Sequence, residues 1–285
     1  MEVIPFDAAL GAEVRGLDLS SPLDARTVQQ LRDAWHQHAL LLFRGQSLTP
    51  AEQVRFSRGF GELEIHVLDQ WRQPEHPEIL IVSNLKDGDR HVGVYNAGRY
   101  WHTDLSYMAE PSKGSILYAI EVPAVDGRPL GDTLFASTGA AFDSLSTDER
   151  ERLRGLRATF SLSHQRQKLE DDGDVATLTD EQRDQTPVVT HAVVQRHPVT
   201  GREVLFVNEG HTIGICDLPE SESRALLGSL YAVITSERHV YRHRWQPGDV
   251  LMWDNIATQH LASFDYALPQ RRYMHRTTLR GSTLK

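Results

Sequence analysis

Apolar positions at helical spacing, preceded by capping residues, mark the predicted helices. Thr49-Pro50-Ala51-Glu52 is a capping box with proline at the first helical position, and it predicts a helix that ends near Phe60. Asp24 and Ser146 are further candidate caps, and Asp217 precedes a stretch with leucines on one side. The pattern predicts four separated helices, with none of the regular strand–helix alternation of a doubly wound sheet.

Between these helices the pattern has a period of two. Residues 115–122 and 271–280 predict single strands, and residues 191–208 predict a hairpin that turns near Thr200-Gly201. Residues 239–245 and 250–253 flank Gln246-Pro247-Gly248-Asp249, which predicts another strand pair around a turn. Short strands with Gly/Pro turns and a few helices favour an antiparallel barrel or sandwich with helical decoration.

The segment 165–187 is acidic and polar, and it interrupts both patterns. Its simplest interpretation is a solvated surface loop, and the functional alternative is a mobile lid over an active site. No sharp linker divides the chain, so we expect one domain over residues 1–285.

Composition narrows the partners and the chemistry. The formal net charge of −9 argues against nucleic acid, which requires clustered positive charge. No apolar run approaches the ~20 residues of a membrane helix, and no secretory signal is visible, so we expect a cytoplasmic protein without a membrane partner. One cysteine excludes a Cys₄ zinc site, whereas 14 histidines favour imidazole and carboxylate as the ligands of any transition metal.

His102 and Asp104 are two residues apart, so on an extended strand both side chains would point to one side. With one distant histidine they would complete the two-histidine, one-carboxylate triad of non-haem iron, and His260 is the candidate. Arg272 and Arg276 are four apart on a predicted strand and share a face, where two buried guanidinium groups would need anions.

These residues stand in stretches that carry a family resemblance. The stretches are LLFRGQSLTPAEQVRFSRGFG (41–61), YWHTDLSY (100–107), GDTLFAS (131–137), LFVNEGH (205–211) and WQPGDVLMWDNIATQH…LPQRRYMHRTTLRG (245–281). In sequence and order they resemble the taurine dioxygenase and 2,4-dichlorophenoxyacetate dioxygenase family of iron(II)/2-oxoglutarate-dependent oxygenases.

The resemblance implies a fold that is mostly β with flanking helices, a double-stranded β-helix or jelly roll. It implies iron(II), 2-oxoglutarate and O₂ as cofactors, a small anionic organic substrate, and a homo-oligomer, either a dimer or a tetramer. The residue roles follow by matching position: His102, Asp104 and His260 as the catalytic metal ligands, Thr133 and Arg272 at the distal carboxylate of 2-oxoglutarate, and Arg276, His66 and Asn208 at the substrate.

Two positions depart from the family pattern. The stretch AVDGRPLGDT is longer than the usual run, which places Thr133 slightly outside its expected spacing from Asp104. Asp69 stands where taurine-type members carry a tyrosine, and it would either pair with a substrate cation or contradict the taurine interpretation. The carboxylate of Asp104 favours hydroxylation or oxygenative cleavage, because related halogenases lack a carboxylate at this position.

The predicted reaction is hydroxylation of a sulfonate such as taurine, or of a carboxylate such as an aryloxyalkanoate, with succinate and CO₂ as products. The presence of His66 slightly favours a sulfonate as the substrate. Two alternatives remain: a zinc-dependent hydrolase with the same His-Asp-His ligands, and a non-catalytic jelly-roll binding protein.

Overall fold

The computed structural model describes residues 1–171 and 178–281. The helices are α1 (Ala25–His38), α2 (Pro50–Arg58), α3 (Thr138–Asp143), α4 (Thr147–Leu153), α5 (Leu162–Asp171), α6 (Asp180–Gln185) and α7 (Glu220–Ile234), with the 3-10 turns η1 (Asp69–Trp71) and η2 (Glu237–His239). The strands are β1 (Glu2–Pro5), β2 (Ala12–Arg15), β3 (Leu40–Phe43), β4 (Ile79–Ser83), β5 (Lys86–Asp87), β6 (Arg90–His91), β7 (Gly114–Glu121), β8 (Ala124–Val125), β9 (Arg128–Pro129), β10 (Thr133–Ser137), β11 (Arg157–Phe160), β12 (Val189–Ala192), β13 (Val194–Arg196), β14 (Glu203–Leu205), β15 (Thr212–Ile215), β16 (Val240–His243), β17 (Val250–Asp254), β18 (Thr258–Ala262) and β19 (Tyr273–Leu279).

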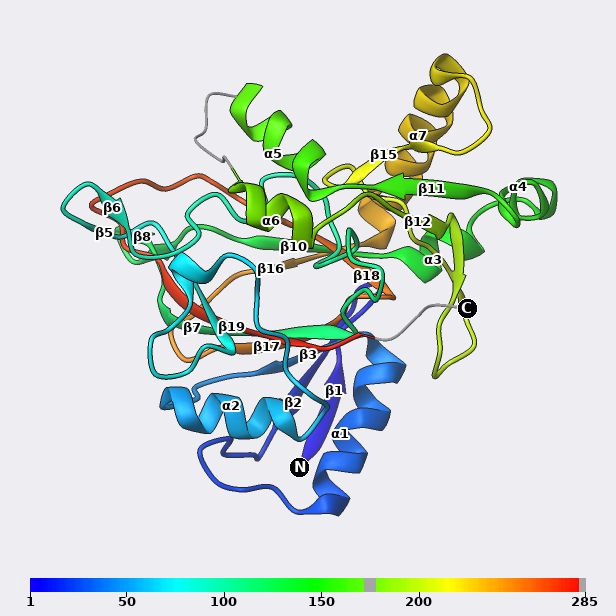
Figure 1. The fold of residues 1–285 in the computed structure, drawn as a ribbon. Coiled ribbons are helices and arrows are strands. Elements are labelled where there is room, and N and C mark those ends of the chain that lie inside the picture. Colours follow the sequence, from blue (N-terminus) through cyan, green and yellow to red (C-terminus); the bar gives the residue numbers. More distant parts are fainter. Residues whose placement is uncertain (172–177, 282–285) are drawn as a thin grey trace.

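A seven-stranded sheet forms the central layer, in the order β1-β2-β3-β17-β7-β19-β4, and α1 and α2 cover one of its faces (Figure 1). Within this sheet, β2 and β3 pair in parallel and the other neighbouring strands pair antiparallel. Along β7, Ile116 and Tyr118 pack with the helices, whereas Leu117 and Ala119 point to the opposite face. Both faces of this sheet are therefore buried, which explains why β7 shows no alternation of apolar and charged side chains.

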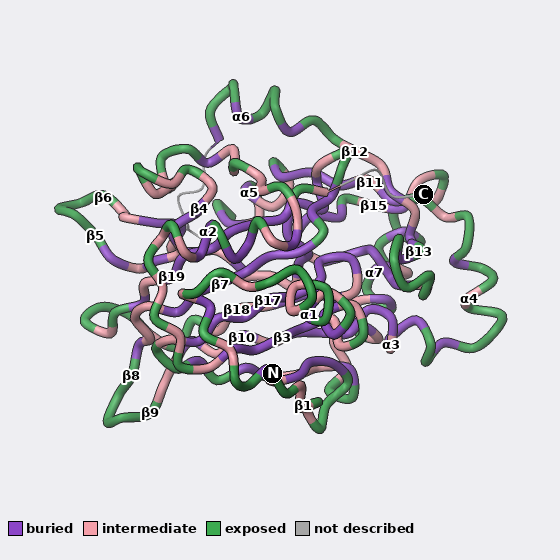
Figure 2. Tube along the Cα trace, turned by 90° about the horizontal axis from the view of Figure 1, so that it is seen from below, coloured by how far each residue is buried: buried purple, intermediate pink, exposed green. Residues whose placement is uncertain are grey.

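A second sheet, β16-β10-β18, lies across the uncovered face of the first. Phe135 of β10 packs with Trp253 of β17 and with Trp245, so these aromatic rings fill the space between the two sheets. The layered interior is visible as the buried centre in Figure 2, with the small β5–β6 and β8–β9 hairpins exposed at the edge. The predicted fold class, mostly β with flanking helices, is confirmed.

Three of the four predicted helix starts agree with the structure. Asp24 accepts a hydrogen bond from the Thr27 amide, and Thr49 and Ser146 each begin a complete capping box. The fourth is wrong: α7 begins at Glu220 after Pro219, without a side-chain cap. Asp217 instead lies in a turn with a φ of 62°, a conformation that aspartate tolerates.

The predicted strand pair around residues 246–249 is also wrong. β16 pairs with β10 in the second sheet, whereas β17 pairs with β3 and β7 in the first. The turn crosses between sheets because the buried Asp249 carboxylate holds it, accepting hydrogen bonds from the Gln246 amide and from Arg44. The hairpin predicted within 191–208 forms as β13 and β14.

The segment 165–187 is not the predicted surface loop. It contains most of α5 and all of α6, and residues 172–177 between them lie outside the described part of the chain. Leu162 and Leu169 lie on the buried side of α5, and Thr179 caps α6. The high charge of the segment concealed this apolar spacing.

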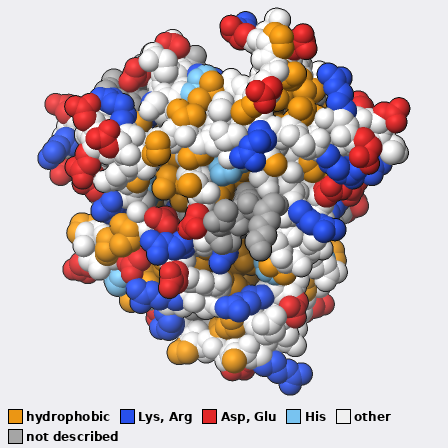
Figure 3. Space-filling view, turned by 45° about the vertical axis from the view of Figure 1, so that its right-hand side comes forward, with side chains coloured by type: hydrophobic (Ala, Val, Ile, Leu, Met, Phe, Trp, Pro, Cys, Tyr) orange, Lys and Arg blue, Asp and Glu red, His pale blue; other side chains and the backbone are white. Residues whose placement is uncertain are grey.

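The features expected of membrane and nucleic-acid partners are long apolar helices and clustered positive charge. Acidic and basic side chains are interspersed on the face shown in Figure 3. Within residues 1–171 and 178–281, no helix has both the length and the apolar character needed to cross a bilayer.

Gly114 is predicted to be intolerant of any side chain. A Cβ atom there would lie 2.4 Å from the Trp35 ring and 2.6 Å from the Trp253 carbonyl oxygen. We expect Gly114→Ala to lower the free energy of unfolding by about 1–3 kcal/mol, as overpacked cores do. The control Gly228→Ala in α7 meets no atom within 4 Å and should raise it by about 0.5–1 kcal/mol. Urea unfolding of both variants measures the difference, and equal effects would contradict the packing argument.

Candidate active site

His102, Asp104 and His260 lie together in the interior between the sheets. Each offers one ligand atom, and the three atoms lie within 4.8 Å of one another. All three side chains are buried, and the His102 Nε2 atom is 3.6 Å from Asp104 Oδ1. The structure therefore brings together the three residues predicted to bind metal.

The local backbone differs from the predicted strand. His102 and His260 exchange two backbone hydrogen bonds of 3.1 and 2.9 Å, which form a single bridge to the middle of β18. The chain then enters a turn, with Leu105 at a φ of 56°. Asp104 thus comes close to His102 through a turn that follows one bridge, not through the alternation of a regular strand.

The ring orientation of His102 suits a metal ligand. Its Nδ1 atom lies 3.0 Å from the carbonyl oxygens of Tyr100 and His260, so Nδ1 carries the proton. The lone pair is then on Nε2, which faces Asp104. Metal-binding histidines commonly donate their second N–H to a carbonyl in this way. The buried Nδ1 of His260 has no hydrogen-bond partner within the described ranges.

Asp104 is held as a carboxylate by two donors. Arg276 Nη1 donates to Oδ1 at 2.7 Å, and Ser115 Oγ donates to Oδ2 at 2.7 Å. Burial is the largest influence on the pKa of Asp104 and would raise it, but Arg276, His260 and His102 together outweigh burial and hold the pKa well below its usual range. A charged oxygen ligand beside two neutral imidazoles is a donor set that fits iron(II).

Two pockets adjoin the triad and share a wall that includes His102 and Arg276. We call them the Arg166 pocket and the Arg272 pocket. The Arg166 pocket is lined by His66, Leu68, Leu80, Val94, Asn96, Ala97, Gly98, His102, Asp104, Leu105, Tyr107, Leu162, Gln165, Arg166, Leu169, His211 and Arg276. The Arg272 pocket is lined by Val82, Ser83, Val94, Tyr95, Ala97, Gly98, His102, Leu117, Thr133, Trp253, His260, Ala262, Tyr266, Arg272 and Arg276.

Arg272 is a buried cation, and no ion pair to it is found in the described structure. Its Nη1 donates to the Gly131 carbonyl at 2.7 Å, and its guanidinium packs near Tyr266. Burial lowers its pKa, because the charged form is poorly solvated there. Thr133 lines the same pocket and accepts a hydrogen bond from Trp245.

The extra residues before Thr133 do not displace it. They form the small β8–β9 hairpin, with Asp126 and Gly127 at positive φ in the turn. The hairpin lies at the edge of the molecule, whereas Thr133 is fixed by pairing of β10 with both β16 and β18. The added length is therefore absorbed outside the site.

His66 and His211 supply hydrogen-bond donors to the Arg166 pocket. The Leu68 amide donates to His66 Nδ1, so the proton of the neutral ring is on Nε2. Burial, with Arg276 nearby, lowers the pKa of His66 to about 3, which keeps it neutral. Burial, with His102 nearby, also holds the pKa of His211 well below its usual range.

Asn208 orients His211 and does not line either pocket. Its Nδ2 donates to Ser106 Oγ, which leaves the Ser106 hydroxyl to donate to His211 Nδ1. The His211 proton is therefore on Nε2, like that of His66. Asp69 is exposed in η1 and lines neither pocket, so the structure does not place it with the other predicted site residues.

Sequence reasoning missed His211 and Arg166. His211 ends the stretch LFVNEGH, in which attention fell on Asn208. Arg166 stands in the segment predicted as a loop, where the spacing of Leu162 and Leu169 was the available signal for a buried helix side.

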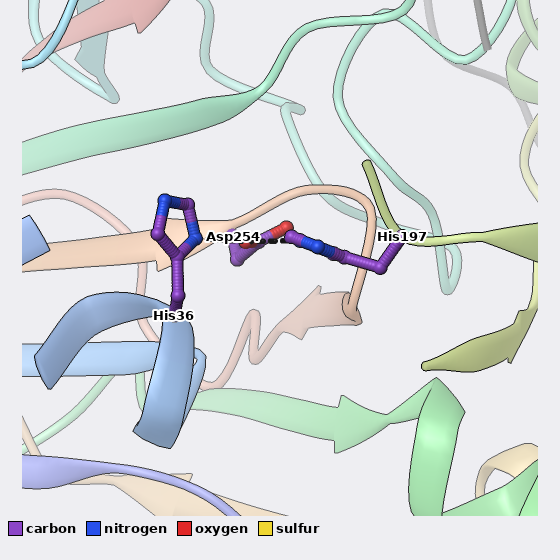
Figure 4. Close-up of side chains that lie close together, drawn as sticks. All are labelled: His36, His197 and Asp254. Carbon is purple, nitrogen blue, oxygen red and sulfur yellow. Dashed lines mark hydrogen bonds and ion pairs between the residues drawn. The ribbon is translucent and has the colours of Figure 1, made fainter. Parts of the chain in front are cut away.

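A second His-His-Asp cluster lies elsewhere, where α1, β17 and the turn after β13 meet (Figure 4). His197 Nε2 is 2.8 Å from Asp254 Oδ2, and His36 Nδ1 is 3.5 Å from the same oxygen. The amides of Val199 and Thr200 both donate to His197 Nδ1. The His197 proton must then be on Nε2, where a metal would need a lone pair. The cluster is suited to anchoring the β13–β14 hairpin and not to binding a metal ion.

Known proteins resemble the chain over nearly its whole length. Residues 2–278 match the family model described as taurine catabolism dioxygenase TauD, TfdA family. The chain belongs to this family.

Three curated relatives are similar throughout. Pentalenolactone F synthase of Streptomyces arenae is 34% identical, with 96% of this chain and 93% of the relative covered. The alpha-ketoglutarate-dependent 2,4-dichlorophenoxyacetate dioxygenase of Cupriavidus pinatubonensis is 32% identical, with 96% of each covered. The alpha-ketoglutarate-dependent sulfate ester dioxygenase of Pseudomonas putida is 33% identical, with 99% and 90% covered.

Among solved structures, a taurine dioxygenase from Burkholderia xenovorans superposes with a TM-score of 0.82 at 31% identity, covering 99% of this chain and 90% of that one. Family membership confirms the predicted jelly roll and the enzyme class, a dioxygenase that uses iron(II), 2-oxoglutarate and O₂. It does not support the zinc hydrolase or the non-catalytic alternative.

The two His-His-Asp clusters are predicted to differ in metal binding. We expect one iron(II) per chain, which His260→Ala loses and His36→Ala retains. The reason is that His102 leaves the lone pair of Nε2 for a metal, whereas His197 holds a proton on Nε2 and donates it to Asp254. Anaerobic equilibrium dialysis followed by metal analysis measures both. The assignment of the metal site to His102, Asp104 and His260 would be refuted if wild type bound two ions per chain, or if His36→Ala bound none.

Proposed function

We propose that His102, Asp104 and His260 bind iron(II), and that residues 1–285 act as one dioxygenase domain. The observation that carries this proposal is the position of the triad between two pockets, each of which contains a buried arginine. Bound iron would supply the centre at which O₂ is activated as 2-oxoglutarate is oxidised to succinate and CO₂.

The Arg272 pocket suits 2-oxoglutarate. Arg272 provides a buried guanidinium for the distal carboxylate, a pair that is strong because both groups are charged. Thr133 provides a hydroxyl beside it. Trp253 and Phe135 pack near His260 and keep this side of the metal apolar, which limits the entry of water.

The Arg166 pocket suits the primary substrate. Six leucine and valine side chains line it, so the body of the molecule is apolar: Leu68, Leu80, Val94, Leu105, Leu162 and Leu169. The polar groups are mainly donors, which favours an anionic substrate of the kinds named for the relatives, a carboxylate or a sulfate ester, or the sulfonate expected from sequence. Asp104 is the acidic residue among those that line the pocket, and Arg276 already pairs with it. The ammonium group of taurine therefore has no evident partner.

Three predictions from sequence stay predictions: the homo-oligomeric state, the cytoplasmic location, and direct contact of Arg276, His66, Asn208 and Asp69 with the substrate. The structure favours contact for His66, which lines the pocket, over contact for Asp69, which does not.

Removal of the Arg272 charge should weaken 2-oxoglutarate binding selectively. We expect Arg272→Gln to need about 10- to 100-fold more 2-oxoglutarate, since a charge-assisted contact contributes about 1.5–3 kcal/mol. The readout is the visible absorption band of the anaerobic iron(II)–2-oxoglutarate complex. The matched control is Arg271→Gln, because exposed Arg271 pairs with Glu121 outside the pocket. If the two variants change 2-oxoglutarate binding equally, Arg272 does not bind the distal carboxylate.

Apolar anions should be better substrates than taurine. With iron(II), ascorbate and 2-oxoglutarate, we expect succinate formation to be stimulated by 4-chlorophenoxyacetate, 1-hexanesulfonate or hexyl sulfate at least about 10-fold more than by taurine. The reason is the desolvation of an unpaired ammonium group in an apolar pocket. Preferential turnover of taurine would contradict this account of the pocket.

A further inference from the structure

Arg166 is a buried cation that the residues around it leave unbalanced. It lies on α5, its side chain is only 8% exposed, and it lines the Arg166 pocket. Its Nε atom has no hydrogen-bond partner, and no ion pair of Arg166 is found in residues 1–171 and 178–281. Burial lowers its pKa, and Tyr107 and Tyr95 oppose this shift. A charge buried without a partner is costly and is rarely kept without a use.

The other two interior arginines do not share this state. Arg276 is balanced by Asp104 at 2.7 Å. Arg272 lines only the pocket on the opposite side of the shared wall. Arg166 is therefore the cation available within its pocket, among the residues that the structure describes.

Other hydrogen-bond donors line the same pocket as Arg166. His66 and His211 are neutral and carry their protons on Nε2, and the buried Nδ2 of Asn96 has no hydrogen-bond partner among the described residues. Both imidazoles line the same pocket as Arg166. These donors lie within a largely apolar wall, and two of them, Arg166 Nε and Asn96 Nδ2, have no acceptor among the described residues. Such an arrangement is complementary to one compact anion.

We propose that Arg166 binds the anionic group of the primary substrate, and that α5 thereby selects apolar molecules with a single carboxylate, sulfonate or sulfate ester group. This assignment moves the anion from Arg276, where the family resemblance placed it, to a helix that sequence analysis predicted as a loop. It rests on the proposed function, because it requires the Arg166 pocket to be the substrate pocket.

The test measures binding without turnover. The protein is loaded with Mn(II) and N-oxalylglycine, a 2-oxoglutarate analogue that is not decarboxylated. It is then titrated calorimetrically with 4-chlorophenoxyacetate, 1-hexanesulfonate and hexyl sulfate, and with the neutral analogues 4-chlorophenoxyethanol and 1-hexanol. We expect at least one anion to bind at least about 10-fold more tightly than its neutral analogue.

The variants isolate the charge of Arg166. Arg166→Gln should weaken binding of that anion at least about 10-fold and leave the affinities for the neutral analogues and for N-oxalylglycine unchanged. Arg166→Lys should bind the anion more tightly than Arg166→Gln, because it keeps the positive charge. Arg152→Gln is the control, because Arg152 is exposed on α4 and lines neither pocket. The thermal midpoint of Arg166→Gln should be equal to or above that of wild type, since an unpaired buried charge is removed.

The outcomes separate the two proposals. The role of Arg166 is overturned if Arg166→Gln binds the anions as tightly as wild type does. It is also overturned if the wild type binds the neutral analogues as tightly as the anions, or binds none of the anions. A lowered thermal midpoint with unchanged anion affinity identifies Arg166 as a structural residue and also overturns it. Failure of the wild type to bind Mn(II) and N-oxalylglycine refutes the proposed function itself.

Discussion

The buried ion pair between Arg276 and Asp104 is the interaction on which the site depends. It joins the last strand of the main sheet to the turn that carries the His-X-Asp motif, 172 residues away in sequence. Burial opposes the charge of Asp104, but the guanidinium, with His260 and His102, keeps the carboxylate ionised, and Ser115 fixes its second oxygen. The same pair forms part of the wall between the two pockets. The one contact therefore orients the proposed metal ligand Asp104, separates the two pockets and balances the charge of Arg276.

Once Arg276 is occupied by Asp104, the interior still holds two further arginines without an ion pair among the described residues. Both Arg272 and Arg166 are buried, and each faces its own pocket. Such charges oppose folding, because their hydration is lost without a compensating anion. Ligands that carry an anion would supply the missing compensation, which is why we propose one anionic molecule on each side of the triad. The net charge of the whole chain, −9, describes the surface and has the opposite sign.

Hydrogen-bond direction separates the two His-His-Asp clusters, although their distances are similar. His102 gives its Nδ1 proton to carbonyl oxygens, which leaves a lone pair for a metal. His197 accepts two amides at Nδ1, which commits its Nε2 proton to Asp254. One cluster is therefore suited to coordination and the other to holding a hairpin against a buried strand. Proximity of ligand atoms does not by itself distinguish these cases.

Local sequence determined the elements whose signals are local. Neighbouring residues determine the helix caps at Asp24, Thr49 and Ser146 and the hairpin within 191–208. The triad candidates were found from short motifs that can be recognised without the tertiary structure. Only the tertiary structure decided which strands pair across the turn at 246–249, because long-range partners for β16 and β17 outweigh the local hairpin. It also decided that α5 packs over the pocket, that Asn208 acts through Ser106, and that Arg276 and Arg166 differ in charge balance. These outcomes depend on which groups share a desolvated space, and sequence spacing does not encode that.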